Sequence, residues 1–238
     1  MKSILSIVAL LFSSVVFGQS ADSTGWKSVK VGVVFAPEYC YRLLNYHPSN
    51  GWVEDLRNNE EEATFGFTTG LGFKMNLSSK FVFESGLFYS IKGEQIKSKD
   101  LEWASPNPDF PVNSKAKYHF KYIELPLKAQ YLIGSGRLKG FVSAGVAVNI
   151  FSEKETKIIS ASADGHSTSE PSVVDLGYLK FNVAAVLGVG MTYDLTRRFS
   201  ISVEPVYKRF LNSIVVDDQA KEYPYSFGAN FGVYYAIK

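Results

Sequence analysis

The sequence predicts an all-β fold, an eight-stranded antiparallel up-and-down transmembrane β-barrel. Segments in which apolar side chains occupy every second position recur along the 238 residues, and short and long connections alternate between them. A period of two is typical of β-strands, because successive side chains point to opposite faces of a sheet. The stretch 63–77, ATFGFTTGLGFKMNL, puts Phe65, Phe67 and Leu71 on one face and mainly glycine and threonine on the other.

The glycine-rich face indicates what surrounds the barrel. A closed barrel of eight strands has a lumen just wide enough for its own side chains, which favours small residues there, and its apolar face then meets lipid. The competing interpretation is a secreted lipocalin-like barrel, with its apolar face inward and charged residues outward. The second face of these segments carries little charge. The pattern therefore favours the membrane barrel.

The connections predict which end of the barrel faces the cell exterior. Eight segments alternate in this way: 26–39, 63–77, 80–92, 118–132, 139–152, 177–193, 199–211 and 223–237. The connections at 76–80, 134–138 and 194–198 are tight, whereas those at 43–62, 93–117, 153–175 and 212–222 are long. With an even number of strands both termini fall beside the tight turns. This is the arrangement of outer-membrane barrels, which have short periplasmic turns and longer extracellular loops.

The first residues predict a secretory signal peptide over 1–18, followed by one outer-membrane β-barrel domain over 19–238. An early lysine precedes the apolar run Ile4–Phe12, and Gly18 supplies a small residue at the expected cleavage point. The run is shorter than the ~20 residues that a spanning helix needs. We therefore expect export, cleavage and residence in the cell outer membrane.

Charge and cysteine content limit the classes of partner. The formal net charge is only +2 and no basic run occurs, so nucleic acid is not an expected partner. Cys40 is the single cysteine, which excludes an internal disulfide and a cysteine-based metal cluster. The four long loops contain 17 of the 23 acidic residues but 8 of the 25 Lys and Arg residues. This charge is either simple loop solvation or part of a contact surface for a protein partner; the oligomeric state is left open.

A ring of cations near the loop end is a second candidate contact with the surroundings. The five residues are Arg42, Lys92, Lys121, Lys208 and Arg209. Cations at that depth can contact anionic head groups, so they either bind outer-membrane lipid and lipopolysaccharide phosphates or simply solvate the rim.

Charged residues are also expected inside the lumen. Inward parity selects Lys30, Lys74, Glu84, Glu124, Lys128 and Glu204. Glu84 and Lys128 lie at similar distances from the tight-turn end on neighbouring strands, so they either pair across the ladder or are hydrated separately. If they pair, exchanging the two charges should restore most of the stability that Glu84→Ala removes. Pro126 and Pro205, inside expected strands, predict a bulge or a local break in the ladder.

Two stretches carry a family resemblance. FESGLFYSIKG (83–93) and YIELPLKAQYL (122–132) resemble the PorT-like outer-membrane β-barrel family, with its aromatic-Gly-Leu-Tyr-Ser-Lys-Gly stretch and its Tyr-x-Glu-x-Pro-Leu strand. The resemblance implies the barrel fold. It also implies that an accessory role in a protein-secretion and gliding system is one possible activity, although fold alone does not carry function.

No catalytic, cofactor-binding or metal-binding residue is predicted, and no cofactor is expected. His47, His119 and His166 are scattered without metal-ligand spacing. His119 has the parity of the lipid-facing side chains near the loop end, where a lipid A-modifying hydrolase could place a catalytic histidine, but it needs a nucleophile or activating carboxylate nearby. We therefore expect a non-enzymatic protein with a binding or structural role at the cell surface and no wide pore.

Overall fold

The computed structural model describes residues 28–103, 110–162, 167–174, 177–216 and 220–237. Eight strands form the barrel wall: β1 (Val29–Tyr46), β2 (Glu61–Asn76), β3 (Phe81–Ile96), β5 (Pro111–Ile133), β6 (Leu138–Ser162), β8 (Phe181–Asp194), β9 (Phe199–Phe210) and β10 (Ala220–Ala236). The predicted signal peptide lies outside the described residues.

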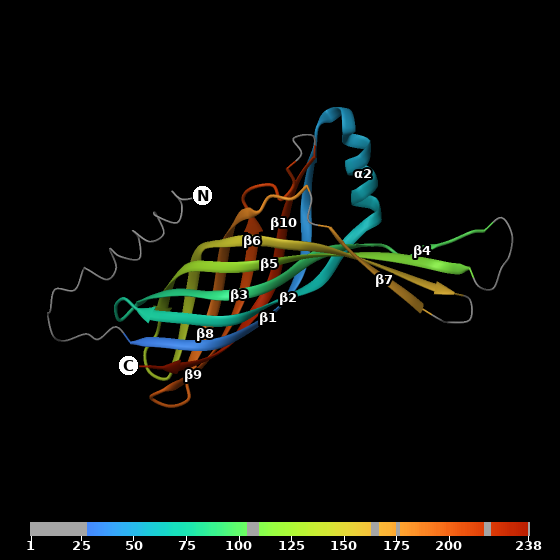
Figure 1. Cartoon of the computed structure of the whole chain (residues 1–238). Coiled ribbons are helices and arrows are strands. Elements are labelled where there is room, and N and C mark those ends of the chain that lie inside the picture. The colour runs from blue at the N-terminus through green and yellow to red at the C-terminus, as the bar shows by residue number, and fades with distance from the viewer. Residues whose placement is uncertain (1–27, 104–109, 163–166, 175–176, 217–219, 238) are drawn as a thin grey trace.

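The wall is a closed ring of antiparallel neighbours (Figure 1). β1 pairs with β2 on one side and with β10 on the other, so the first and last strands close the barrel. β5 pairs with both β3 and β6. Closure satisfies the backbone hydrogen bonds of every wall strand without water, which the hydrocarbon layer requires. The predicted fold class is confirmed.

The strands differ from the predicted ranges mainly at the loop end. β5 begins at Pro111 rather than 118, and β6 continues to Ser162 rather than ending at 152. The predicted strand start at 177 is wrong, because β8 begins at Phe181, and Gly177 has the positive φ of 86° that breaks an extended chain. The tight turns lie where they were expected.

The outer face is apolar and is bordered by aromatic pairs at both ends. Tyr39 packs edge-on against Phe65 toward the loop end, where their exposed fractions are 51% and 76%. Phe81 packs against Tyr131 toward the tight turns, and both are exposed. Exposed aliphatic side chains such as Leu71 lie between these levels. An apolar band between aromatic girdles is the lipid-facing surface of outer-membrane barrels.

Small residues on the inward face are required by the narrow lumen. A Cβ on Gly188 would lie 2.7 Å from both Glu204 Oε1 and Ser143 Oγ. That distance is shorter than a van der Waals contact, so a side chain there would displace the buried carboxylate. The glycine-rich face of the sequence is thus the packed interior of the barrel.

Two prolines interrupt the ladder without shifting its register. Pro126 is paired with Ala147 of β6, but the pairing of β5 with β3 stops at Leu127 and resumes at Glu124. Pro205 is paired with Ala229 of β10, and the β8–β9 ladder is interrupted beside it. Because proline lacks an N–H donor, one side of each ladder opens. The predicted local breaks are confirmed, and neither position forms a bulge.

Two structured elements project from the loop end (Figure 1). The first long connection contains the 3₁₀ turn η1 (Pro48–Asn50) and helix α2 (Gly51–Glu60). The hairpin of β5 and β6 continues beyond the barrel, where β4 (Lys99–Asp100) and β7 (Ser167–Val174) pair with its outer edges. These regions were expected to be loops. No helix in the described part of the chain is both long and apolar enough to cross a membrane.

Candidate functional site

Charged side chains fill the lumen in three successive layers. The layer nearest the tight turns is a chain of four alternating charges on β2, β3, β5 and β9. Lys74 Nζ lies 3.4 Å from Glu84, and Lys128 Nζ lies 2.9 Å from Glu84 and 2.8 Å from Glu204. All four residues are buried. Opposite charges at these distances offset the cost of removing each one from water.

Neutral donors complete this first layer. Ser143 donates to Glu204 Oε1 at 2.5 Å, and Asn230 donates to Glu204 Oε2 at 2.7 Å. The ammonium of Lys74 lies 4.3 Å from the centre of the Tyr234 ring, a cation–π geometry. Each charge of the layer therefore has at least one partner besides its neighbour in the ladder.

The middle layer is a closed four-membered ring of ion pairs. Lys92 Nζ lies 2.9 Å from Glu38 and 3.4 Å from Glu124, and Lys208 Nζ lies 2.8 Å from Glu38 and 2.6 Å from Glu124. Thr68 also donates to Glu38 at 2.7 Å. Two ammonium groups and two carboxylates leave no net charge. The ring joins β1, β3, β5 and β9 across the barrel.

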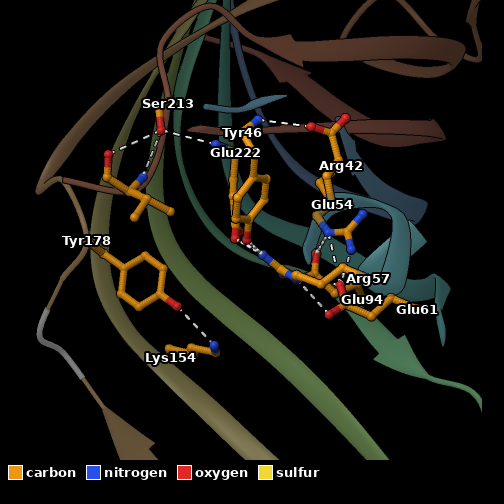
Figure 2. Close-up of polar contacts among 11 residues, drawn as sticks. Arg42, Tyr46, Glu54, Arg57, Glu61, Glu94, Lys154, Tyr178, Ser213 and Glu222 are labelled. Carbon is orange, nitrogen blue, oxygen red and sulfur yellow. Dashed lines mark hydrogen bonds and ion pairs between the residues drawn. The ribbon is translucent and has the colours of Figure 1, made fainter. Parts of the chain in front are cut away.

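The third layer seals the extracellular mouth and is completed by helix α2. Arg57 reaches from the helix into the lumen, as Figure 2 shows, and its Nε donates to Glu61 at 2.9 Å. The same guanidinium donates to the Tyr46 hydroxyl at 2.9 Å and pairs with Glu222. Arg42, deeper in the wall, also pairs with Glu61. The helix is therefore attached to the barrel through one inserted arginine.

The ion-pair cluster on this side of the mouth contains three carboxylates, those of Glu61, Glu94 and Glu222, against the two guanidinium groups of Arg42 and Arg57. Glu94 lies 3.5 Å from Arg57 and 3.6 Å from Arg42. It follows Ile91, the last apolar outward side chain of β3, so it lies above the lipid. Burial, and then the charge of Glu222, raise the pKa of Glu94 from its ordinary value of 4.5 to about 7. The raised pKa favours the protonated carboxyl, which reduces the excess negative charge.

Aromatic side chains fill the other half of the mouth. The buried members of this hydrophobic cluster are the aromatic Phe120, Tyr122, Phe151 and Phe210 and the aliphatic Ala184 and Ile214. Lys154 donates to the Tyr178 hydroxyl at 2.9 Å (Figure 2). Its ammonium also lies 4.4 Å from the centre of the Tyr118 ring. The ammonium is thus held among aromatic rings.

Two spaces inside the barrel are small. A cavity of about 20 Å³ lies between the first two charge layers, and one of about 50 Å³ lies near Lys30 and Asp194 at the tight-turn end. The smaller is just enough for about one water molecule. The lumen is a packed polar core.

The structure corrects the predicted ring of lipid-binding cations. Arg42, Lys92 and Lys208 point into the lumen and are buried in ion pairs. Lys121 is on the outer face but lies 2.7 Å from both Glu153 and Glu155. Arg209 is the remaining member and is exposed on the outer face.

The six predicted lumen charges do point inward. Lys74, Glu84, Glu124, Lys128 and Glu204 are buried in the layers described above. Lys30 is only partly buried and lies 3.0 Å from Asp194 beside the tight turns. The predicted pair of Glu84 and Lys128 is confirmed.

His119 lies on the outer face of β5, directly opposite Glu155 of β6 and Gly93 of β3. Among the hydrogen bonds of the described residues, none involves its ring. Groups of His, Cys, Asp and Glu that could hold a metal ion are absent from the part of the chain that the structure describes. The geometry adds no nucleophile to the one histidine that the sequence singled out.

Glu38 and the mouth residues Arg57 and Glu222 were missed from the sequence. Glu38 has the parity of the lumen charges on β1, so the alternation itself could have found it. Arg57 and Glu222 come together across 165 positions. A contact between residues so far apart in the sequence cannot be predicted from a local sequence pattern.

A closed ring of eight strands with a filled polar lumen and an apolar outer face defines a small outer-membrane β-barrel. The chain belongs to the outer membrane protein beta-barrel domain family, whose model matches residues 17–216. The protein is thus located in the cell outer membrane.

Solved outer-membrane barrels resemble the fold at low identity. Neisserial surface protein A is 11% identical, with 86% of this chain and 96% of that one covered and a TM-score of 0.43. Outer membrane protein AlkL, solved in lipid bilayers, is 14% identical over 93% of this chain and 95% of that one, with a TM-score of 0.46. OprG from Pseudomonas aeruginosa is 14% identical, with 90% of this chain and 97% of that one covered and a TM-score of 0.40. No curated protein matches the sequence.

Proposed function

We propose that this protein is a non-enzymatic surface-binding barrel that contacts a protein partner through an extracellular β-sheet and conducts no solutes. The sheet, here called the blade, consists of β4, residues 111–117 of β5, residues 157–162 of β6, and β7. The observation that carries the proposal is the continued pairing of β5 with β6 from Lys117 and Lys157 out to Pro111 and Ser162. A long connection that only closed the barrel would not need this ladder.

The blade has properties of a peptide-binding sheet. Among the described strands, β4 and β7 lie at its two edges. An open edge offers unpaired N–H and C=O groups, to which an extended segment of a partner can add as a further strand. β7 is the longer edge, with eight residues against two in β4.

Exposed apolar side chains on the blade favour a protein partner. Trp103 and Phe110 stack with their ring centres 4.9 Å apart, and both are exposed. Val112, Ile158 and Val173 are also exposed above the barrel. Apolar and aromatic groups on an otherwise polar surface are typical of a protein contact site.

The test shortens the blade and keeps the barrel. Residues 99–114 and 160–168 are each replaced by a short Gly-Ser linker, and a photo-crosslinking amino acid is introduced at Val173 in both versions. We expect a covalent adduct of protein mass on cells carrying the full blade and none with the shortened one. The same photo-probe at Val189, an outward side chain of β8, is the control for membrane contacts. Equal adducts with and without the blade would contradict the proposal.

The narrower PorT-like relationship and its accessory role in secretion stay predictions from the resemblance. Secretion of cargo by a deletion strain would separate that role from simple surface binding. The lipid A hydrolase is not proposed, because Glu155, the carboxylate opposite His119, pairs with Lys121, and no hydrogen bond to the His119 ring is found among the described residues.

A further inference from the structure

A hollow lies on the outer face of the barrel wall, away from the lumen. It has a volume of about 430 Å³. Its lining residues are Tyr39, Glu62, Ala63, Thr64, Phe65, Gln95, Lys115, Lys117 and His119. They come from β1, β2, β3 and β5.

Near the hollow, one outward position of β3 carries no side chain. Gly93 occupies an outward position directly opposite His119, and its neighbours in this outward row are Ile91 and Gln95. No side chain can be added there, because a Cβ would lie 1.9 Å from the carbonyl oxygen of Tyr118. In the neighbouring strand, pairing between β2 and β3 is irregular between Ala63 and Phe67. The wall is therefore locally recessed at this level.

One wall of the hollow is cationic. Lys115, Lys117 and His119 follow one another at every second position of β5, so they share its outer face. Lys157 of β6 is the direct partner of Lys117. Two like charges directly opposite in a ladder are destabilising. An anion bound beside them would remove that repulsion.

Acidic groups nearby are already engaged. Glu62 accepts a hydrogen bond from Gln95 at 2.8 Å and lies 3.6 Å from Lys115. Glu155, opposite His119, lies 2.7 Å from Lys121. Among the ion pairs of the described residues, none includes Lys117 or Lys157. Within the described residues, the charges of these two lysines are thus not neutralised by an ion pair.

The height of the hollow matches the boundary between lipid and water. Below it, β5 turns outward the apolar side chains Ile123 and Leu127, both of which are exposed. At its lower edge lies the exposed aromatic pair Tyr39 and Phe65. Aromatic girdles mark the interface in outer-membrane barrels. A ligand here would meet apolar wall below and cations above, which is the polarity of an anionic lipid.

We propose that the hollow binds a phosphate head group of an outer-leaflet glycolipid, with Lys117, Lys157 and His119 facing the phosphate and the acyl chains lying along the wall below. The occupant is a membrane lipid rather than a soluble anion, because the apolar and cationic parts of the surface are continuous. Lys117 and Lys157 lie at the base of the blade, outside residues 99–114 and 160–168 that the blade test removes, so the two proposals can be tested separately.

The experiment measures lipid binding to the folded full-length protein in detergent by native mass spectrometry. The probes are diphosphorylated lipid A, the same lipid without phosphates, and inorganic phosphate. One variant removes the two charges, Lys117→Gln with Lys157→Gln. A second, Ala63→Trp, fills the hollow and leaves the charge unchanged. The matched control is Lys180→Gln with Lys221→Gln, which removes two exposed lysines elsewhere on the loop side.

We expect the wild type and the control to prefer the diphosphorylated lipid. The charge-removing variant should bind it about 10- to 30-fold more weakly, because each cation near an anionic head group contributes about 1 kcal/mol. Ala63→Trp should weaken binding with no change in net charge. All variants are first tested for the folded, fast-migrating band on gels, and His119→Gln replaces any that does not fold.

Three results would overturn the proposal. Equal binding of diphosphorylated lipid A by the charge-removing variant and the control would exclude these lysines. Equal binding of the phosphate-free lipid would exclude phosphate recognition. Inorganic phosphate that competes as strongly as the lipid would instead show a site for soluble anions.

Discussion

Glu84 of β3 lies directly opposite Lys128 of β5, and the Lys128 ammonium is 2.9 Å from the Glu84 carboxylate. Neither residue is restricted to this pair. Glu84 also faces Lys74, at 3.4 Å, and Lys128 also faces Glu204, at 2.8 Å. The pair is therefore the centre of a four-charge chain across the lumen, and this changes what a charge exchange should do.

The first prediction concerns this chain. Glu84→Ala leaves Lys74 without its carboxylate inside the barrel, so we expect a loss on the order of 3 kcal/mol. The exchange Glu84→Lys with Lys128→Glu should recover little, because it places a second ammonium beside Lys74 and a second carboxylate beside Glu204. Removing Lys74 and Glu84 together, as Lys74→Met with Glu84→Gln, leaves the Lys128–Glu204 pair complete and should cost less than Glu84→Ala alone.

The measurement is the temperature at which the folded, fast-migrating band disappears on gels. A double-mutant cycle over Lys74→Met and Glu84→Gln gives their coupling. Full recovery by the charge exchange would show that the pair acts independently of Lys74 and Glu204. A Glu84→Ala variant that melts with the wild type would show that the charges are not coupled at all.

The second prediction concerns the middle ring. Glu38→Gln leaves Lys92 and Lys208 with Glu124 as their shared carboxylate. Breaking a buried ion pair from one side typically costs about 3–5 kcal/mol. Thr68→Val removes only one neutral donor to Glu38 and should cost about 1 kcal/mol. A Glu38→Gln variant as stable as Thr68→Val, by the same gel assay, would contradict the ring as a stabilising unit.

Much of this lumen could be predicted from alternation, and the failures have specific causes. Glu84 and Lys128 were found because both have inward parity. Lys92 and Lys208 have the same inward parity. They were nevertheless predicted to contact lipid, because they lie near the loop end of their strands. The inward position of Lys154 could not be predicted from alternation, because the irregularity between β5 and β6 next to Lys121 shifts the alternation in β6. Beyond a bulge, a period-two pattern assigns side chains to the wrong face.

Helix α2 was missed for another reason. Its ten residues contain few apolar positions, and none of its residues is buried. Such a short helix depends on tertiary contacts more than on local propensity. One of the contacts that hold it, Arg57 with Glu222, joins distant parts of the chain. The outer hollow likewise brings together residues of β1, β2, β3 and β5, and the pairing that aligns these strands cannot be read from one strand alone.

The third prediction concerns export. We expect the mature protein to begin near Gln19 and to fractionate with the outer membrane, because the signal peptide is predicted to be cleaved. N-terminal sequencing of the protein from detergent-solubilised outer membranes gives the answer. An intact N-terminus at Met1, or recovery without detergent, would contradict it.

The fourth prediction concerns conductance. Because three charge layers and an aromatic cluster fill the lumen, we expect no large, stable conductance in planar bilayers. Arg57→Ala removes the inserted arginine but leaves the ring around Glu38 intact, so it should remain closed as well. Steady currents from either protein would show that the lumen is not packed in the membrane.

The fifth prediction concerns pH and the mouth of the barrel. Glu94 has a pKa of about 7 in the folded protein, against an ordinary value of 4.5. Between pH 4.5 and pH 7 the folded protein therefore holds a proton that the unfolded chain has released. The bound proton stabilises the folded protein by at most about 3 kcal/mol. This stabilisation is fully present below pH 4.5 and is lost as the pH rises through 7. Glu222 raises this pKa, while Arg42 and Arg57 lower it, so the surrounding cluster sets the window.

Glu94→Gln keeps a neutral side chain at every pH and tests this directly. We expect its melting temperature to match the wild type at pH 5 and to exceed it at pH 8, where the wild-type carboxyl is ionised in excess over the two arginines. The control is Glu62→Gln, whose side chain is 40% exposed on the outer face. It should give the same small difference from the wild type at both pH values. A Glu94→Gln variant that is less stable than the wild type at pH 8 would contradict this prediction. Arg42 and Arg57 would then stabilise the ionised carboxylate more strongly than burial and the charge of Glu222 destabilise it. The mouth would then be held closed by ion pairs alone.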